Sequence, residues 1–138
     1  MKSKVKKFEI LEHKADLKIR VFGKTKEELF EKAMVGMFAA AEYQPKVEGK
    51  EKRIKVKISS LDLPSLLVDF LNEILYLTET KKLVFKKVKF KKFSEREIEG
   101  DLTGKPLKRI GVHIKGATYH DLEIRQNKMF EATILFDV

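Results

Sequence analysis

Carboxylates at two points of the sequence are placed where they could do chemistry. Asp16 lies at the polar centre of the stretch FEILEHKADLKIRVF (8–22), where one apolar run ends and the next begins. At the other end of the sequence, Asp137 and Val138 directly follow the apolar run ATILF. We expect this run to be a buried strand that holds the terminus in the fold, with the side-chain carboxylate of Asp137 beside the terminal carboxylate of Val138.

Each of these polar groups also has an ordinary structural interpretation. Aspartates bond to their own backbone in turns, and Asp16 fits such a position. His13 and His120 lack the spacing of a zinc enzyme, and no Ser-His-Asp order is recognisable, so we expect structural or supporting roles for them. The absence of cysteine excludes disulfides, thiolate metal sites and a cysteine nucleophile.

Two helices are predicted to cover the strands that position these groups. Thr25 and Glu28 have capping-box spacing and start a helix with one apolar stripe that extends to about Glu42. Asp62 caps a second helix with a broader apolar face. On the polar side of this helix we expect Asp69 and Glu73 to be a solvated pair.

The segment LVFKKVKFKKF (83–93) allows two interpretations. It could be a basic surface with phenylalanine rings that stack on RNA bases. Lysine is also a standard protection of a sheet edge against pairing, and we favour this second interpretation. The lysines concerned are Lys86, Lys87, Lys89, Lys91 and Lys92.

The remaining strands are predicted from alternation of apolar and polar residues. The segment 53–59 alternates, and 95–107 is expected to be a short strand followed by a loop because it contains Gly100, Gly104 and Pro106. Residues 110–115 are expected to form a strand with Ile110, Val112 and Ile114 inward. The segments 117–125 and 129–138 should form a hairpin.

These elements predict an α+β fold in a single domain over residues 1–138. Mostly antiparallel strands from both chain ends meet in a sheet, and the two amphipathic helices pack on it. The length suffices to bury about two thirds of the surface of the unfolded chain.

Composition constrains the surroundings and the partners. The 37% of charged residues is dominated by Lys and Glu, a balance typical of heat-adapted proteins. The net charge of +9 fits contact with RNA or an acidic protein, or a solvated lysine-rich surface. We expect a cytoplasmic protein, because the sequence has neither a signal-peptide pattern nor an apolar run long enough to span a membrane.

Five segments, spread over nearly the whole sequence, resemble the archease family. They are HKADLKIRVFGKT, AMVGMF, LLVDFLNEILYL, IKGATYHDLEI and the terminal FDV. One departure from the family pattern is that lysines replace the usual Thr and Gly at Lys14 and Lys18, whereas His13 and Asp16 remain.

The resemblance implies a protein that has no catalytic activity of its own. It would activate an RtcB-type RNA ligase, by promoting guanylylation and turnover of the ligase in tRNA splicing and RNA repair. It also implies a Ca²⁺ site formed by Asp16, Asp137 and Val138, and these oxygen donors suit that hard cation. Lys115 and His120 are candidates for a partner-facing surface. A secondary role as a chaperone-like partner of a tRNA cytosine methyltransferase is also linked to the family.

Two other classes of function remain open from the sequence. One is a metal-dependent hydrolase that uses Asp16 and Asp137. The other is a simple RNA-binding module that uses the lysine-rich strand. Turnover by the pure protein would favour the first, and salt-sensitive RNA binding would favour the second.

Overall fold

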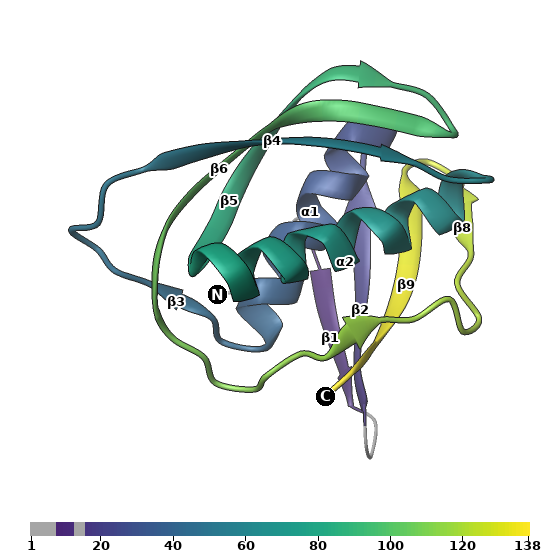
Figure 1. The fold of residues 1–138 in the computed structure, drawn as a ribbon. Coiled ribbons are helices and arrows are strands. Elements are labelled where there is room, and N and C mark those ends of the chain that lie inside the picture. Colours follow the sequence, from purple (N-terminus) through teal and green to yellow (C-terminus); the bar gives the residue numbers. More distant parts are fainter. Residues whose placement is uncertain (1–7, 13–15) are drawn as a thin grey trace.

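The computed structural model describes residues 8–12 and 16–138 of the chain. It has the predicted α+β architecture, with two antiparallel sheets and two helices between them (Figure 1). Each helix contacts strands of both sheets. Within the described residues, neither helix is long and apolar enough to cross a membrane.

The first sheet joins the two ends of the chain, as the sequence predicts. Its strand order is β1-β2-β9-β7, and β8 also pairs with β9. The strands are β1 (Phe8–Glu12), β2 (Asp16–Gly23), β7 (Gly116–Ala117), β8 (Ile124–Gln126) and β9 (Phe130–Asp137). Strand β2 pairs with β9 along its whole length, and the alternating residues Ile19 and Val21 are fully buried on the core face.

Both helices begin at the predicted caps. Helix α1 (Lys26–Ala40) starts after Thr25, whose hydroxyl accepts a hydrogen bond from the Glu28 N–H at 3.0 Å. Helix α2 (Leu63–Lys81) starts after Asp62, whose carboxylate accepts from the Ser65 N–H at 2.8 Å. These bonds satisfy backbone donors that have no partner inside the helix, and the Ser65 bond holds the pKa of Asp62 below its ordinary value.

The second sheet is built around one long central strand. Strand β6 pairs with all three other members of the sheet. The strands are β3 (Gln44–Pro45), β4 (Lys52–Ser59), β5 (Leu83–Phe93) and β6 (Glu97–Arg109). Among the described residues β5 pairs only with β6, so the predicted edge position of the lysine-rich strand is confirmed.

Two bulges explain the irregular spacing of aromatics in β5. The register shifts between Phe85 and Lys87 and again between Phe90 and Lys92. Each shift absorbs one extra residue, so Phe85, Val88, Phe90 and Phe93 all lie toward the core despite their uneven spacing.

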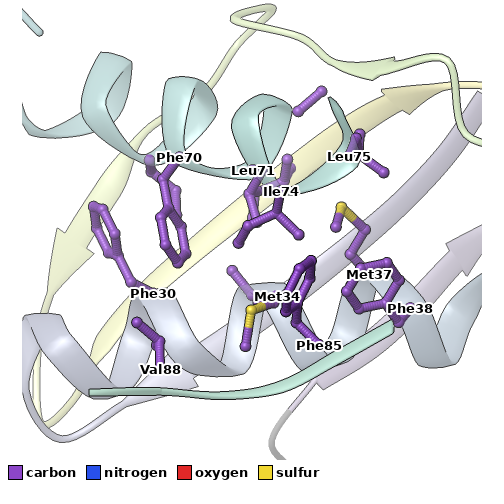
Figure 2. Packing of buried hydrophobic residues seen from close by; sticks show 14 of the residues in the cluster. Phe30, Met34, Met37, Phe38, Phe70, Leu71, Ile74, Leu75, Phe85 and Val88 are labelled. Atoms are coloured by element: carbon purple, nitrogen blue, oxygen red, sulfur yellow. The ribbon is translucent and has the colours of Figure 1, made fainter. Parts of the chain in front are cut away.

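Apolar side chains of both helices and β5 meet in the core between the sheets. Figure 2 shows Phe30 of α1 beside Phe70 of α2, with Met34 and Ile74 in the same cluster. The Phe30 ring lies 5.5 Å from the Phe70 ring, centroid to centroid. These four side chains are fully buried, which confirms that both helix stripes are core and that the α1 methionines fill it.

Three predicted elements differ from the structure. The segment 95–107 was expected to end in a loop, but strand β6 continues through Gly100, Gly104 and Pro106. The glycines are needed because β5 passes so close that a Cβ at Gly100 would lie 2.6 Å from the Lys89 carbonyl oxygen.

The strand expected at 110–115 is a loop. Ile114 is buried and its N–H donates to the buried Tyr43 hydroxyl at 3.0 Å, while Val112 is 46% exposed. Burial raises the pKa of this tyrosine. The alternation of apolar and polar residues over 110–115 therefore belongs to a loop that packs against the core and not to a strand. The first arm of the predicted hairpin is also shorter than expected, because only β7 and β8 are strands and 118–123 connects them as a loop.

Candidate functional site

The strand register brings the two predicted aspartates together. Asp16 begins β2 and Asp137 ends β9, and these two residues are direct partners across the antiparallel pair. Direct partners project from the same face of a sheet, and this is the face opposite the buried Ile19 and Phe136. Asp137 is exposed and Asp16 is half-buried, so the acidic pair is open to solvent on the outer face of the first sheet.

The end of β9 is held from both sides. On one side it pairs with β2, and on the other Gly116 of β7 is the register partner of Asp137. The Lys115 N–H donates to the Asp137 carbonyl oxygen at 2.7 Å. The Val138 side chain packs partly buried against the core. The backbone around the acidic pair is therefore fixed in position, and it includes Lys115, whose side chain is exposed.

His120 lies at the same pocket as Asp16. The two residues line a pocket of about 270 Å³ together with Lys18, Asp121, Thr133 and Leu135. His120 Nε2 is 3.1 Å from an Asp121 carboxylate oxygen. The structure thus brings Asp16, Asp137 and His120 to one end of the first sheet, while the predicted site residue His13 lies outside the described residues.

Helix α2 positions the segment that carries His120. The Asn72 side chain accepts from the Ala117 N–H at 2.8 Å and donates to the Ala117 carbonyl at 3.1 Å. One turn earlier, the Asp69 carboxylate accepts hydrogen bonds from the hydroxyls of Ser60 and Tyr119. The expectation that Asp69 is only part of a solvated pair is therefore wrong, because the carboxylate is half-buried and ties α2 to the loop. Its hydrogen bond raises the pKa of Tyr119 above the ordinary value.

The donor set of this site suits a hard cation. Like charges directly opposite on neighbouring strands repel, and a cation bound by both carboxylates would remove that repulsion. Carboxylates and backbone carbonyls are the oxygen ligands that Ca²⁺ takes, and the sequence offers no thiolate for a softer metal. Over residues 8–12 and 16–138, no group of three or more His, Cys, Asp or Glu side chains is close enough to hold a metal ion. The two aspartates fit a calcium ion as part of its coordination sphere.

Basic side chains continue the outer face away from the acidic end. Lys18 and Arg20 follow Asp16 on this face at every second position. Arg20 lies between two carboxylates, with its Nη1 3.3 Å from Glu9 and its Nε 3.6 Å from Glu131. Arg20 thus sits between Glu9 and Glu131 on the face that carries Asp16 and Asp137 at its end.

Sequence reasoning missed the supporting residues Asn72, Asp69 and Tyr119. Asn72 and Asp69 lie on the polar side of α2, where solvated side chains are the rule, and no short-range pattern connects them to residues 117–119. The available signal was that these polar residues adjoin buried positions, since Phe70 and Leu71, which lie between Asp69 and Asn72, are fully buried.

Comparisons with known proteins agree with the fold and the sequence motifs. Residues 8–138 match the archease protein family (MTH1598/TM1083). The chain is 38% identical over 149 residues to the protein archease of Methanosarcina mazei and 35% identical over 147 residues to that of Methanosarcina barkeri, with both chains covered completely in each case.

Two solved structures share the fold. The solution structure of Methanobacterium thermoautotrophicum protein 1598 has a TM-score of 0.69 and 26% identity, covering 96% of this chain and 99% of that one. The crystal structure of a Thermotoga maritima archease, named a possible chaperone, has a TM-score of 0.69 at 22% identity, covering 93% and 94% of the two chains. The match across residues 8–138 and the full-length relatives show that the chain belongs to the archease protein family.

Proposed function

We propose that the protein is a non-catalytic activator of an RtcB-type RNA ligase, which promotes guanylylation and turnover of the ligase in tRNA splicing and RNA repair in the cytoplasm. Membership of the archease family supports this role. The structural observation that carries it is the direct opposition of Asp16 and Asp137 on an exposed sheet end. An acidic pair on a rigid element, open on one side, is suited to joining a partner through a shared cation.

The cation proposed for this position is Ca²⁺, bound by the side chains of Asp16 and Asp137 and by the terminal carboxylate of Val138. These groups do not complete the six to eight oxygen ligands of calcium, so water or oxygen atoms of the partner would supply the rest. Calcium bound here supplies a positive charge that both proteins can share. The chain itself fixes the two strand ends, and Lys115 and His120 lie beside them as candidate partner contacts.

The test is ligase guanylylation measured with and without the purified protein. Wild-type protein should raise the amount of guanylylated ligase formed per minute, and Asp16→Ala should abolish that increase without loss of folding. Glu123→Ala is the matched control, since it removes an exposed carboxylate from the connecting loop of the same sheet. Full activation by Asp16→Ala would contradict the proposal. RNA or nucleotide turnover in reactions without ligase would instead support a metal-dependent hydrolase.

A second role is favoured by one comparison. The Thermotoga maritima neighbour is named a possible chaperone, which fits a chaperone-like partner of a tRNA cytosine methyltransferase. Light scattering of such a methyltransferase, heated with and without the protein, tests this role. Unchanged aggregation would argue against it.

A further inference from the structure

The outer face of the second sheet carries two rows of basic side chains. On β4 the row consists of Arg53, Lys55 and Lys57, which alternate with the inward-facing Ile54 and Val56. On β5, Lys87 and Lys89 form the second row. The register places Arg53 and Lys87 on opposite sides of Thr103, and Lys55 and Lys89 on opposite sides of Asp101. The two rows therefore share one face, with β6 between them.

Most of these cations form no ion pair within residues 8–12 and 16–138. Lys91 lies 3.5 Å from Asp101, Lys92 lies 3.2 Å from Glu97, and Lys86 pairs with Glu51. Five others make no ion pair with another described residue; they are Arg53, Lys55, Lys57, Lys87 and Lys89. On β6, Glu99 lies between Lys57 and Lys92 and offsets part of this charge. The basic residues still outnumber the acidic ones, so the face remains strongly positive.

Protection of a sheet edge explains only some of the lysines. Lys86 and Lys91 are the extra residues of the two β5 bulges, and bulges and lysines at an edge oppose pairing with another chain. Lys87 and Lys89 are instead in regular register with β6 and project from the face. Strand β4 is the opposite edge of this sheet, but Arg53, Lys55 and Lys57 are likewise in regular register with β6 and project from the same face.

The aromatic residues of β5 are not available to a ligand on this face. Phe90 and Phe93 pack against each other with ring centroids 5.1 Å apart and contact Phe30 of the core. Phe85 is buried. The earlier interpretation of these rings as base-stacking groups is therefore wrong, and a nucleic acid could be bound here only through its backbone charges.

The face is also hollowed. A depression of about 510 Å³ is lined by five basic and two acidic side chains and Thr103. Basic residues within a row are about 7 Å apart and the two rows lie about 10 Å apart, from the spacings of residues and strands in a sheet. A regular array of point charges of this kind complements a chain of regularly spaced anions better than it complements the irregular carboxylates of a folded protein.

We propose that the outer face of the β4–β6–β5 sheet binds the phosphate backbone of single-stranded RNA without sequence preference. The five unneutralised cations contact phosphates, and bases make no stacking contact with the protein. This site is separate from the Asp16–Asp137 pair, which lies on the other sheet, and it does not depend on the proposed role in ligase activation.

The test uses the full chain and two labelled probes, oligouridylate and oligoadenylate, whose binding is followed by fluorescence anisotropy across salt. With five phosphate contacts, affinity should fall roughly a hundredfold between about 50 and 200 mM salt, since the slope is about 0.7 per contact for single strands. The variant K55Q/K57Q/K87Q/K89Q retains one of the five cations, so its affinity should change only about threefold over the same range. Both probes should bind wild-type protein equally.

Two matched proteins make the result specific. K81Q/K128Q removes exposed lysines from other surfaces and should bind RNA nearly as wild type does, apart from the loss of overall charge. D16A should also bind RNA as wild type does, so failure of the ligase proposal would leave this one standing. Should the quadruple variant fail to give a wild-type circular dichroism spectrum, K87Q/K89Q is used, with an expected fall in slope of about 1.4.

Three results would overturn the proposal. One is equal RNA affinity of the quadruple and K81Q/K128Q variants, and another is a salt slope near zero for wild type. The third is binding of polyglutamate as tightly as RNA, which would assign the face to acidic proteins.

Discussion

Replacement of Asn72 by leucine should weaken the segment that carries His120. Leucine has the same branched shape as asparagine but can neither donate nor accept a hydrogen bond, so the Ala117 N–H and carbonyl both lose their side-chain partner. Ala117 is 8% exposed, so water cannot readily replace that partner. At about 1–1.5 kcal/mol for each lost bond, the free energy of unfolding should fall by roughly 2–3 kcal/mol.

Thermal denaturation measures the overall loss. For a domain of this size each kcal/mol corresponds to about 3–4 °C, so the Tm of Asn72→Leu should fall by roughly 6–12 °C. Amide hydrogen exchange localises the effect, because the Ala117 N–H should exchange much faster while amides in the middle of β6 change only by the global loss. Glu73→Leu is the control, since Glu73 follows Asn72 in α2 and makes no hydrogen bond to the 117–119 segment.

The reasoning would be refuted by an Asn72→Leu protein with wild-type stability. It would also be refuted if protection of Ala117 and of the β6 amides fell by the same factor at every site. In either case Asn72 would not be the link between α2 and the loop. Calcium affinity reports the consequence for the site, since displacement of residues 115–117 removes the backbone support of Asp137.

Three further predictions concern other parts of the structure. Calcium at a hundred times its Kd should raise the free energy of unfolding of the wild type by about 2.7 kcal/mol, measured by thermal denaturation. Asp16→Asn, or a chain extended beyond Val138, should gain far less from calcium. Equal gains would show that these groups are not part of the site. Gly100→Ala should destabilise by about 1–3 kcal/mol in urea unfolding because its methyl group meets the β5 backbone at 2.6 Å, and an unchanged midpoint would show that β5 can move away. The hydrogen bond to Asp69 raises the pKa of Tyr119, so this bond stabilises the fold fully below the unfolded pKa near 10.0, and the stabilisation is lost as pH rises through the folded pKa. Tyr119→Phe should lack that loss of stability at alkaline pH. Parallel curves of stability against pH for the two proteins would contradict the assignment.

The helices could be predicted because they depend on local patterns. The Thr25 and Asp62 caps each act within three residues, and the apolar stripes of α1 and α2 follow the helical period. Strand β6 could not be predicted in this way. Gly100 and Gly104 are the usual signals of a loop, but here they admit the close approach of a strand more than ten residues away. Only the tertiary pairing distinguishes these two meanings of glycine.

The same limit applies to the candidate site. The sequence identifies Asp16 and Asp137 as carboxylates at strand ends. Their direct opposition, however, depends on the register of β2 against β9. If one strand shifted by one residue, one of the two aspartates would lie on the core face. The burial of Ile19 and Phe136 excludes that shift. The hydrophobic core therefore fixes the acidic pair, although neither aspartate belongs to the core.

The two charged regions are expected to act independently. The acidic pair belongs to the first sheet and the basic rows to the second, and both helices pack between these sheets. Exposed charges are largely screened beyond about 8 Å at physiological salt, so a change of charge on one sheet should have little electrostatic effect on the other. Substitutions in the two regions lie on different sheets and should be additive. A protein that combines Asp16→Ala with the four glutamine substitutions should therefore lose calcium response and RNA binding to the same extents as the separate variants, and any excess loss would reveal a mechanical coupling through α1 and α2.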